Sequence, residues 1–179
     1  FIPLNFDVSD LPATKTALQT LPTDLRNHID VLVNNAGLAL GLEPADKTDF
    51  ADWQQMVNTN ILGLIHLTHE ILPLMVANND GYIINLSSTA GNYPYFGGNV
   101  YGATKAFVTQ FSLNLRADLV GKNIRVSNIE PGLCGGTEFS NIRFHGDDAK
   151  AAQVYDSVQY VTPQDIANMV AWLIEQPKH

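Results

Sequence analysis

The sequence predicts an α/β fold, in which a doubly wound parallel sheet is covered by helices on both faces. Three short apolar runs, at residues 29–33, 82–86 and 124–129, are rich in β-branched residues and alternate with longer stretches of helical periodicity. Each run stops at small or polar residues, as a buried parallel strand followed by a tight loop does. Strands that alternate with helices in this way predict a parallel sheet joined by right-handed crossovers.

The elements are expected in the order β-α-β-α-β-α-β-α. Residues 1–6 are expected to form a strand, and residues 11–21 a helix that ends at Pro22. After the strand at 29–33, an apolar stripe from Ile61 to Met75 predicts the second helix. After the strand at 82–86, a further stripe predicts a helix over residues 101–119.

The last helix is signalled by its first residues. Thr162 supplies an N-cap hydroxyl, Pro163 suits the first helical position, and Asp165 completes a capping box. The sequence therefore predicts a helix that follows the strand at 124–129 and extends from this point through residue 174.

Composition predicts one globular domain over residues 1–179 that binds a small molecule. The chain is 45% hydrophobic and 16% charged, which suffices for one sizeable core. Its net charge is −8 and its ten Lys and Arg residues are scattered, which argues against a nucleic-acid partner. Cys134 is the single cysteine, which excludes an internal disulfide, and no Cys/His cluster has zinc-ligand spacing. With no signal peptide and no uninterrupted apolar run of about 18 residues, we expect a cytoplasmic protein without a membrane partner or a metal.

Polar or small residues follow three strands at the point where each strand ends. They are Asn34 to Gly37, Ser87 with Ser88, and Pro131 with Gly132. Because ligands bind beyond the carboxyl ends of the strands in such sheets, we expect these residues to converge on one site. Residues 135–160 are polar and weakly periodic, and we expect them to form a substrate lid.

Tyr101 and Lys105 are four residues apart at the start of a predicted helix, so they share one face. An ammonium group close to a phenol favours the phenolate, and the pair therefore predicts a tyrosine with a lowered pKa. Such a phenol can exchange a proton with a carbonyl or an alcohol. The alternative is that both side chains merely share a half-buried helix face.

Three further polar positions each carry a functional and a structural interpretation. The Ser88 hydroxyl could orient a carbonyl within reach of Tyr101, or Ser87 and Ser88 could simply cap the loop. Asn60 lies unfavourably inside a predicted helix, where its amide could hold a water that passes protons to Lys105 or could bond to the backbone. The turn at residues 34–37 could allow a flat ligand to approach or could be a turn alone.

Together, the turn at 34–37 with Asn60, Ser88, Tyr101 and Lys105 resembles the signature of the short-chain dehydrogenases/reductases, in order and in spacing. The resemblance covers essentially the whole chain. It implies a Rossmann-type sheet and hydride transfer to or from a nicotinamide. It also implies that Ser88 orients the substrate, Tyr101 acts as acid or base, Lys105 binds the nicotinamide ribose and lowers the tyrosine pKa, and Asn60 completes a proton relay.

The same resemblance implies a set of cofactor contacts. Asp7 and Val8 would flank the adenine, while Asn34, Ala36 and Gly37 would line the cofactor cleft. Near the nicotinamide carboxamide the implied residues are Pro131, Gly132, Cys134 and Thr137. The family usually has a branched apolar residue where Cys134 stands, and the pair Gly135-Gly136 displaces Thr137 by one position.

The longer strings at residues 34–41, 97–107 and 130–141 resemble the bacterial NADP-dependent 3-hydroxy acid dehydrogenases. This resemblance implies NADP as the cofactor and serine, L-allo-threonine or 3-hydroxypropionate, or their 3-oxo partners, as substrates. The sequence contains neither the family's glycine-rich phosphate loop, within an N-terminal βαβ unit, nor its last strand. We therefore expect the chain as written to bind a dinucleotide poorly.

Substrate contacts and assembly remain open between alternatives. Arg143 could hold a substrate carboxylate bidentately or could be a solvated surface residue. Tyr93 and Tyr95 could shape the pocket or pack their loop. The apolar positions 107, 111 and 115 suit either the helix face that helps to assemble tetramers in relatives or ordinary core packing. For the function itself, the alternatives are a reductase of a sugar, a diketone or an acyl-carrier substrate, and a non-catalytic scaffold or nucleotide sensor.

Overall fold

The computed structural model describes residues 1–178 and has an α/β architecture. Its parallel sheet has the strand order β1 (Val31–Asn34), β2 (Gly81–Leu86) and β3 (Ile124–Ile129). Val31 is in register with Tyr82, and Ile83 with Val126. The predicted α/β fold with a parallel sheet is confirmed.

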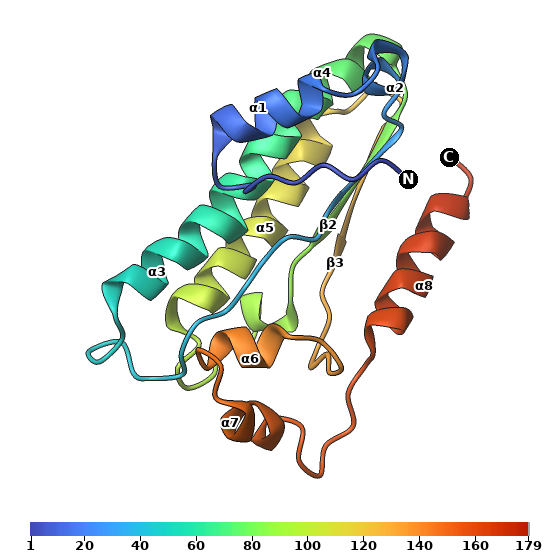
Figure 1. The fold of residues 1–179 in the computed structure, drawn as a ribbon. Helices are drawn as coiled ribbons and strands as arrows, with labels where there is room; N and C mark the ends of the chain where they lie inside the picture. Colours follow the sequence, from blue (N-terminus) through green and yellow to red (C-terminus); the bar gives the residue numbers. More distant parts are fainter. Residues whose placement is uncertain (179) are drawn as a thin grey trace.

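The helices form two layers around the sheet, as Figure 1 shows: α4 and α5 lie on one side of it and α8 on the other. In chain order the helical segments are α1 (Leu11–Gln19), α2 (Thr23–Asn27), α3 (Phe50–Val57), the π-helix η1 (Asn58–Gly63), α4 (Leu64–Asn78), the 3₁₀ turn η2 (Thr89–Gly91), α5 (Asn99–Asp118), α6 (Phe139–Arg143), α7 (Asp148–Gln153) and α8 (Pro163–Glu175).

Alternate residues of β2 fill the two halves of the core, because successive side chains of a strand point to opposite faces. Ile83 packs with Ile71 and Met75 of α4 in one cluster. Tyr82 and Ile84 belong to a second cluster, against which Ile166, Val170 and Leu173 of α8 pack. Burial of each such aliphatic side chain stabilises the fold by roughly 1.5–3 kcal/mol.

The continuous helical stretch Phe50–Asn78 is long and apolar enough to cross a membrane by length and composition. Its last half, α4, nevertheless packs Ile71 and Met75 against the sheet residues Leu32 and Ile83. This packing is that of a core helix.

The local signals for helix ends were informative. Thr162 caps α8 by accepting a hydrogen bond from the backbone of Asp165, whose own carboxylate accepts one from the backbone of Thr162. The predicted capping box is therefore confirmed, and α8 begins at Pro163 as expected.

The predicted strand at residues 1–6 is wrong, since this segment has no regular secondary structure. A strand exists only where its backbone groups pair with a neighbouring strand. Among the described residues, the backbone of residues 1–6 pairs with no strand, and the sheet ends at β1. The second predicted helix also differs: it begins earlier, at Phe50, and contains a π-helical segment in its middle.

The segment at residues 135–160 lies below the carboxyl ends of the strands and contains the short helices α6 and α7 (Figure 1). It joins β3 to α8 and therefore passes from one side of the sheet to the other. This position is where a substrate lid is expected, although its movement remains a prediction.

Candidate active site

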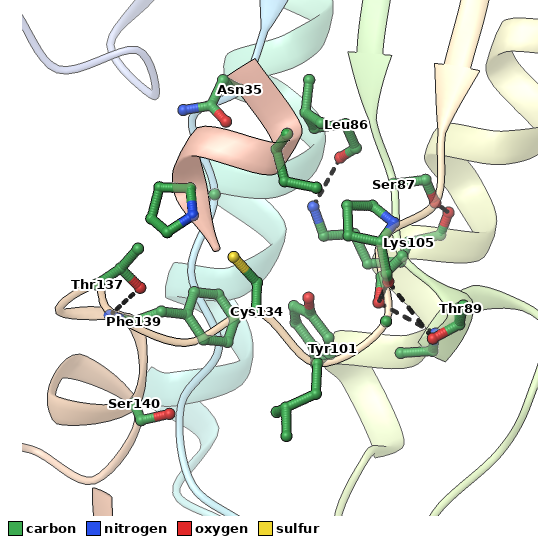
Figure 2. Close-up of a pocket in the computed structure, with 18 of the residues that line it drawn as sticks. Asn35, Leu86, Ser87, Thr89, Tyr101, Lys105, Cys134, Thr137, Phe139 and Ser140 are labelled. Atoms are coloured by element: carbon green, nitrogen blue, oxygen red, sulfur yellow. Dashed lines mark hydrogen bonds between the residues drawn. The ribbon is translucent and has the colours of Figure 1, made fainter. Parts of the chain in front are cut away.

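A cavity of about 960 Å³ lies at the carboxyl ends of the strands, as Figure 2 shows. Its wall combines residues that follow β1, β2 and β3 with the start of α5, the lid segment and one face of α8. The predicted site residues that line it are Gly37, Ser88, Tyr93, Tyr95, Tyr101, Lys105, Pro131, Gly132, Cys134, Thr137 and Arg143. The structure thus brings together the strand ends that the sequence expected to converge.

Tyr101 and Lys105 are both buried in the first turns of α5. The ammonium of Lys105 donates to the carbonyl oxygen of Leu86 at 2.8 Å, a bond that is visible in Figure 2. Lys105 Nζ lies 5.9 Å from the centroid of the Tyr101 ring. The two side chains share a helix face as predicted, but the ammonium is directed at the end of β2.

The expectation that Lys105 lowers the pKa of Tyr101 is wrong for this structure. Burial raises the pKa of Tyr101 to about 12, although the Ser88 side chain and the charge of Arg143 act in the opposite direction. Burial also lowers the pKa of Lys105 to about 8. For both groups, removal from water is the main cause of the shift, and it disfavours the charged form.

Ser88 caps the loop, and its role in orienting a carbonyl stays a prediction. Its hydroxyl caps η2 by accepting from the backbone N–H of Ala90 at 3.1 Å, and it donates to the carbonyl of Pro131 at 3.3 Å. The Ser88 side chain also acts on Tyr101, whose pKa it tends to lower. Its neighbour Ser87 is structural: its Oγ donates to the carbonyl of Lys105 at 2.7 Å.

Asn60 lies in the π-helix η1, a distortion that frequently marks functional sites. Its Oδ1 accepts from the Leu38 N–H at 2.8 Å, while Nδ2 donates to the Leu38 carbonyl at 2.8 Å and to Thr104 Oγ1 at 3.0 Å. The interpretation as a buried amide bonded to the backbone therefore describes the side chain, and a water relay stays a prediction.

Gly37 completes this part of the wall. A Cβ on Gly37 would lie 3.3 Å from Asn60 Oδ1 and 3.4 Å from Lys105 Nζ. The small residue thus allows the loop after β1 to pass directly over these two side chains.

The structure places four predicted cofactor residues outside the cavity wall. Asn34 is buried in the core, where its Nδ2 donates to Thr68 Oγ1 and Asn85 Oδ1. Ala36 is exposed, Asp7 accepts two hydrogen bonds from Ser9, and Val8 accepts one from His66. The backbone hydrogen bond to Ser9 is the main cause that lowers the pKa of Asp7.

Asn35, which belongs to the turn at 34–37 that was expected at the site, lines the cavity, whereas Asn34 does not. Consecutive residues at the end of a strand point to opposite sides, so the choice between two adjacent asparagines depends on register. Nothing in the Asn34-Asn35 pair itself distinguishes the two positions.

The segment after β3 forms the opposite wall. Burial raises the pKa of the Cys134 thiol, and Thr137 Oγ1 accepts from the Phe139 N–H at 3.2 Å (Figure 2). A Cβ on Gly135 would lie 2.6 Å from the ring of Tyr160. The close approach of this ring therefore explains why the first glycine of the Gly135-Gly136 pair has no side chain.

Arg143 is half-buried and held by the body of the protein. Its Nε donates to the Gly41 carbonyl at 3.1 Å and its Nη2 to the Tyr95 hydroxyl at 2.6 Å. In return, the Gly41 N–H donates to the Arg143 carbonyl at 2.8 Å. The guanidinium carbon lies 5.7 Å from the Tyr101 ring centroid, so a positive charge stands beside the candidate acid–base group.

Tyr93 and Tyr95 both lie in the cavity wall, but only Tyr95 has a fixed role in the site. Tyr95 accepts from Arg143, whereas Tyr93 is 72% exposed. No group of three or more His, Cys, Asp and Glu side chains that could hold a metal ion occurs within residues 1–178.

Comparisons with known proteins agree with this geometry. The sequence profile of the family described as short chain dehydrogenase matches residues 1–147. A "Probable NADP-dependent dehydrogenase" of Haemophilus influenzae is 68% identical over 179 residues, all of this chain and 71% of the relative. The "NADP-dependent 3-hydroxy acid dehydrogenase YdfG" of Escherichia coli K12 is 56% identical over 97% of this chain and 69% of the relative. A solved serine dehydrogenase in its closed form, complexed with NADP+, superposes with a TM-score of 0.95 and 56% identity, over 97% of this chain and 70% of that one.

Proposed function

Because this chain belongs to the short-chain dehydrogenase family, we propose that it is an NADP-dependent oxidoreductase that acts on the CH–OH group of a small 3-hydroxy acid. The single observation that carries the proposal is the meeting of Ser88, Tyr101 and Lys105 in the wall of one cavity. Serine, allo-threonine and 3-hydroxypropionate are the proposed substrates, and their 3-oxo partners are the products.

The residues of the cavity fit a nicotinamide nucleotide. Gly37 leaves the loop after β1 free to pass over Lys105, and a Cβ on Gly132 would meet nothing within 4 Å. Lys105 is the residue that would hold the nicotinamide ribose, while Pro131, Gly132 and Thr137 would face the carboxamide. When bound, the nicotinamide supplies the acceptor or donor of a hydride.

Proton transfer is assigned to the chain's own residues. In the direction of reduction, the Tyr101 phenol gives its proton to the carbonyl oxygen, and in oxidation the phenolate takes the proton of the substrate hydroxyl. Because the pKa of Tyr101 is about 12, the phenolate forms when the phenol has first passed its own proton to the path through Lys105. The Ser88 hydroxyl, which lies with Tyr101 in the cavity wall, holds the same substrate oxygen. The ammonium of Lys105 and the amide of Asn60 are the proposed next members of a proton path.

Arg143 supports a carboxylate-bearing substrate. Lys105 and Arg143 are the cationic side chains in the described wall, and Lys105 donates to Leu86. Arg143 uses Nε and Nη2 for Gly41 and Tyr95, which leaves the remaining guanidinium donors available. A carboxylate held by Arg143 would lie close to Tyr101. In a 3-hydroxy acid the carboxylate and the reacting hydroxyl are likewise close together.

Much of the wall is apolar, and this favours the alternative of an uncharged carbonyl substrate. Leu86, Phe139, Ile142 and Val170 all line the cavity. NADPH formation, followed at 340 nm with serine, 3-hydroxypropionate and neutral alcohols, distinguishes the two. We expect a higher kcat/KM for the acids than for the neutral alcohols. An equal or higher kcat/KM for the neutral alcohols would favour an uncharged substrate.

We also propose that the protein works in the cytoplasm as a homotetramer. Phe107 and Phe111 of α5 are half-buried and stack with ring centroids 5.6 Å apart, and Leu113 of the same helix is 47% exposed. Leu115, by contrast, belongs to the core. Sedimentation equilibrium tests the assembly: a mass of about four chains is expected, and a monomer would contradict it.

A further inference from the structure

Glu130 joins three elements from outside the cavity wall. It directly follows β3, and its Oε1 accepts from Asn128 Nδ2 at 2.8 Å and from Thr109 Oγ1 at 3.0 Å. Its Oε2 accepts from Asn92 Nδ2 at 2.6 Å. One carboxylate therefore connects the end of β3, the middle of α5 and the loop that follows β2.

Each of these contacts lies close to a candidate catalytic group. Asn92 ends the η2 turn that Ser88 caps. Thr109 is one helical turn beyond Lys105, and its hydroxyl lies 2.9 Å from Ser87 Oγ. Glu130 thus reaches both the loop that carries Ser88 and the helix that carries Tyr101.

The neighbouring backbone strengthens the same junction. The carbonyl of Pro131, next to Glu130, accepts from the Thr89 N–H at 3.0 Å and from Ser88 Oγ at 3.3 Å. A displacement of Glu130 would therefore move the acceptor of the Ser88 hydroxyl as well as the loop.

The chemistry of a carboxylate suits this position. A carboxylate only accepts hydrogen bonds and has about four acceptor sites, so it can receive three donors from different directions. Within residues 1–178, no Lys, Arg or His nitrogen lies within 4.0 Å of Glu130. Its contacts are directional hydrogen bonds to two amides and a hydroxyl, and they fix geometry.

We propose that Glu130 is a positioning residue, which holds the Ser88 loop against α5 and so sets the alignment of the Ser88 hydroxyl with the Tyr101 phenol. Its effect on turnover rests on the proposed oxidoreductase function. Its effect on the alignment of the two hydroxyls does not.

The test compares two substitutions at the same position. Glu130→Ala removes all three hydrogen bonds, whereas the amide of Glu130→Gln can keep Thr109 and Asn128 on its oxygen while Asn92 rotates to accept from its nitrogen. We expect Glu130→Ala to lower kcat roughly 10- to 100-fold, as small misplacements of reacting groups do, with KM within about twofold. Glu130→Gln is expected to retain most of the wild-type kcat. The exposed Glu175→Ala in α8 is the matched control.

A second measurement does not depend on turnover. The NMR signal of ¹³Cζ-labelled Tyr101, assigned by its loss in Tyr101→Phe, reports how the Ser88 side chain acts on the phenol. We expect the signal to move in Glu130→Ala in the direction seen in Ser88→Ala, and to stay near its wild-type position in Glu130→Gln. A Tyr101 signal that is unchanged in Glu130→Ala would overturn the proposal.

The NMR and kinetic measurements together distinguish the positioning role of Glu130 from the proposed oxidoreductase function. If the Tyr101 signal moves as expected but no protein oxidises a 3-hydroxy acid, the proposed function fails and the positioning role stands. If Glu130→Ala does not fold, Asn92→Ala, which removes only the link to the exposed loop, takes its place. An unmoved Tyr101 signal and an unchanged kcat in Asn92→Ala would then overturn the positioning role.

Discussion

Phe139 packs edge-on against Tyr101, with ring centroids 5.9 Å apart and ring planes at 65°. Phe139 begins α6 in the lid segment, whereas Tyr101 lies in the first turn of α5. Because burial is the main cause that raises the pKa of Tyr101 to about 12, the lid takes part in setting the proton affinity of this phenol.

Removal of this contact should therefore lower the pKa of Tyr101. Phe139→Ala admits water to the phenol, and we expect the pKa to move from about 12 toward its ordinary value of 10.0. The measurement is an NMR pH titration of the ¹³Cζ signal of Tyr101. Phe50→Ala, which removes a 70% exposed ring from α3, should leave the titration unchanged. If the pKa of Tyr101 is the same in Phe139→Ala and in the wild type, Phe139 does not influence the proton affinity of the phenol.

Lys105 should make stability rise with pH between about 8 and 10. Its pKa is about 8 in the folded chain and 10.5 as the ordinary value, so the unfolded state binds more protons in this range. The rise should be on the order of 1–3 kcal/mol in the wild type and absent in Lys105→Met. Above pH 10, deprotonation of Tyr101 in the unfolded state opposes it. Urea unfolding at pH 7, 8, 9 and 10 measures the difference, with the exposed Lys122→Met as control.

Asn60 should matter for stability as well as for any proton transfer. Asn60→Ala leaves the partly buried N–H and carbonyl of Leu38 without their partner, which should lower the free energy of unfolding by about 1–3 kcal/mol. The exposed Asn114→Ala in α5 should change it by less than about 0.5 kcal/mol. Urea unfolding at pH 7 compares the variants. If Asn60→Ala lost activity at unchanged stability, the backbone clamp would be unimportant.

Arg143 should discriminate between acids and neutral alcohols. Arg143→Ala is expected to raise KM for serine at least about tenfold, because a charged hydrogen bond contributes about 1.5–3 kcal/mol, with little effect on a neutral alcohol. Arg143→Lys keeps the charge but loses the planar fork, so it should rescue serine only in part. Steady-state kinetics with both substrates decides, and an equal rise in KM for both would assign Arg143 to lid packing alone.

The sequence predicted best what depends on local signals. The buried strands at residues 82–86 and 124–129 and the capping box of Thr162 and Asp165 were each encoded by residues adjacent in the chain. The strand at residues 1–6 failed because a strand also needs a neighbour, which the local pattern does not supply.

The sequence predicted which residues line the site better than it predicted their pKa values. The convergence of Gly37, Ser88, Tyr101 and Lys105 followed from the position of strand ends and helix starts. The pKa of Tyr101 depends instead on its burial, to which residues far along the chain such as Phe139 and Arg143 contribute. For the same reason Glu130 escaped notice, since its partners belong to three separate elements.

Hydride transfer from a deuterated substrate tests the central claim most directly. Serine deuterated at C3 is incubated with NADP and the wild-type protein, and the reduced nucleotide is analysed by mass spectrometry. We expect one deuterium in the nucleotide, and a rate that falls at least about a hundredfold in Tyr101→Phe because the acid–base group is lost. No deuterium in the nucleotide, or an equal rate in Tyr101→Phe, would contradict it.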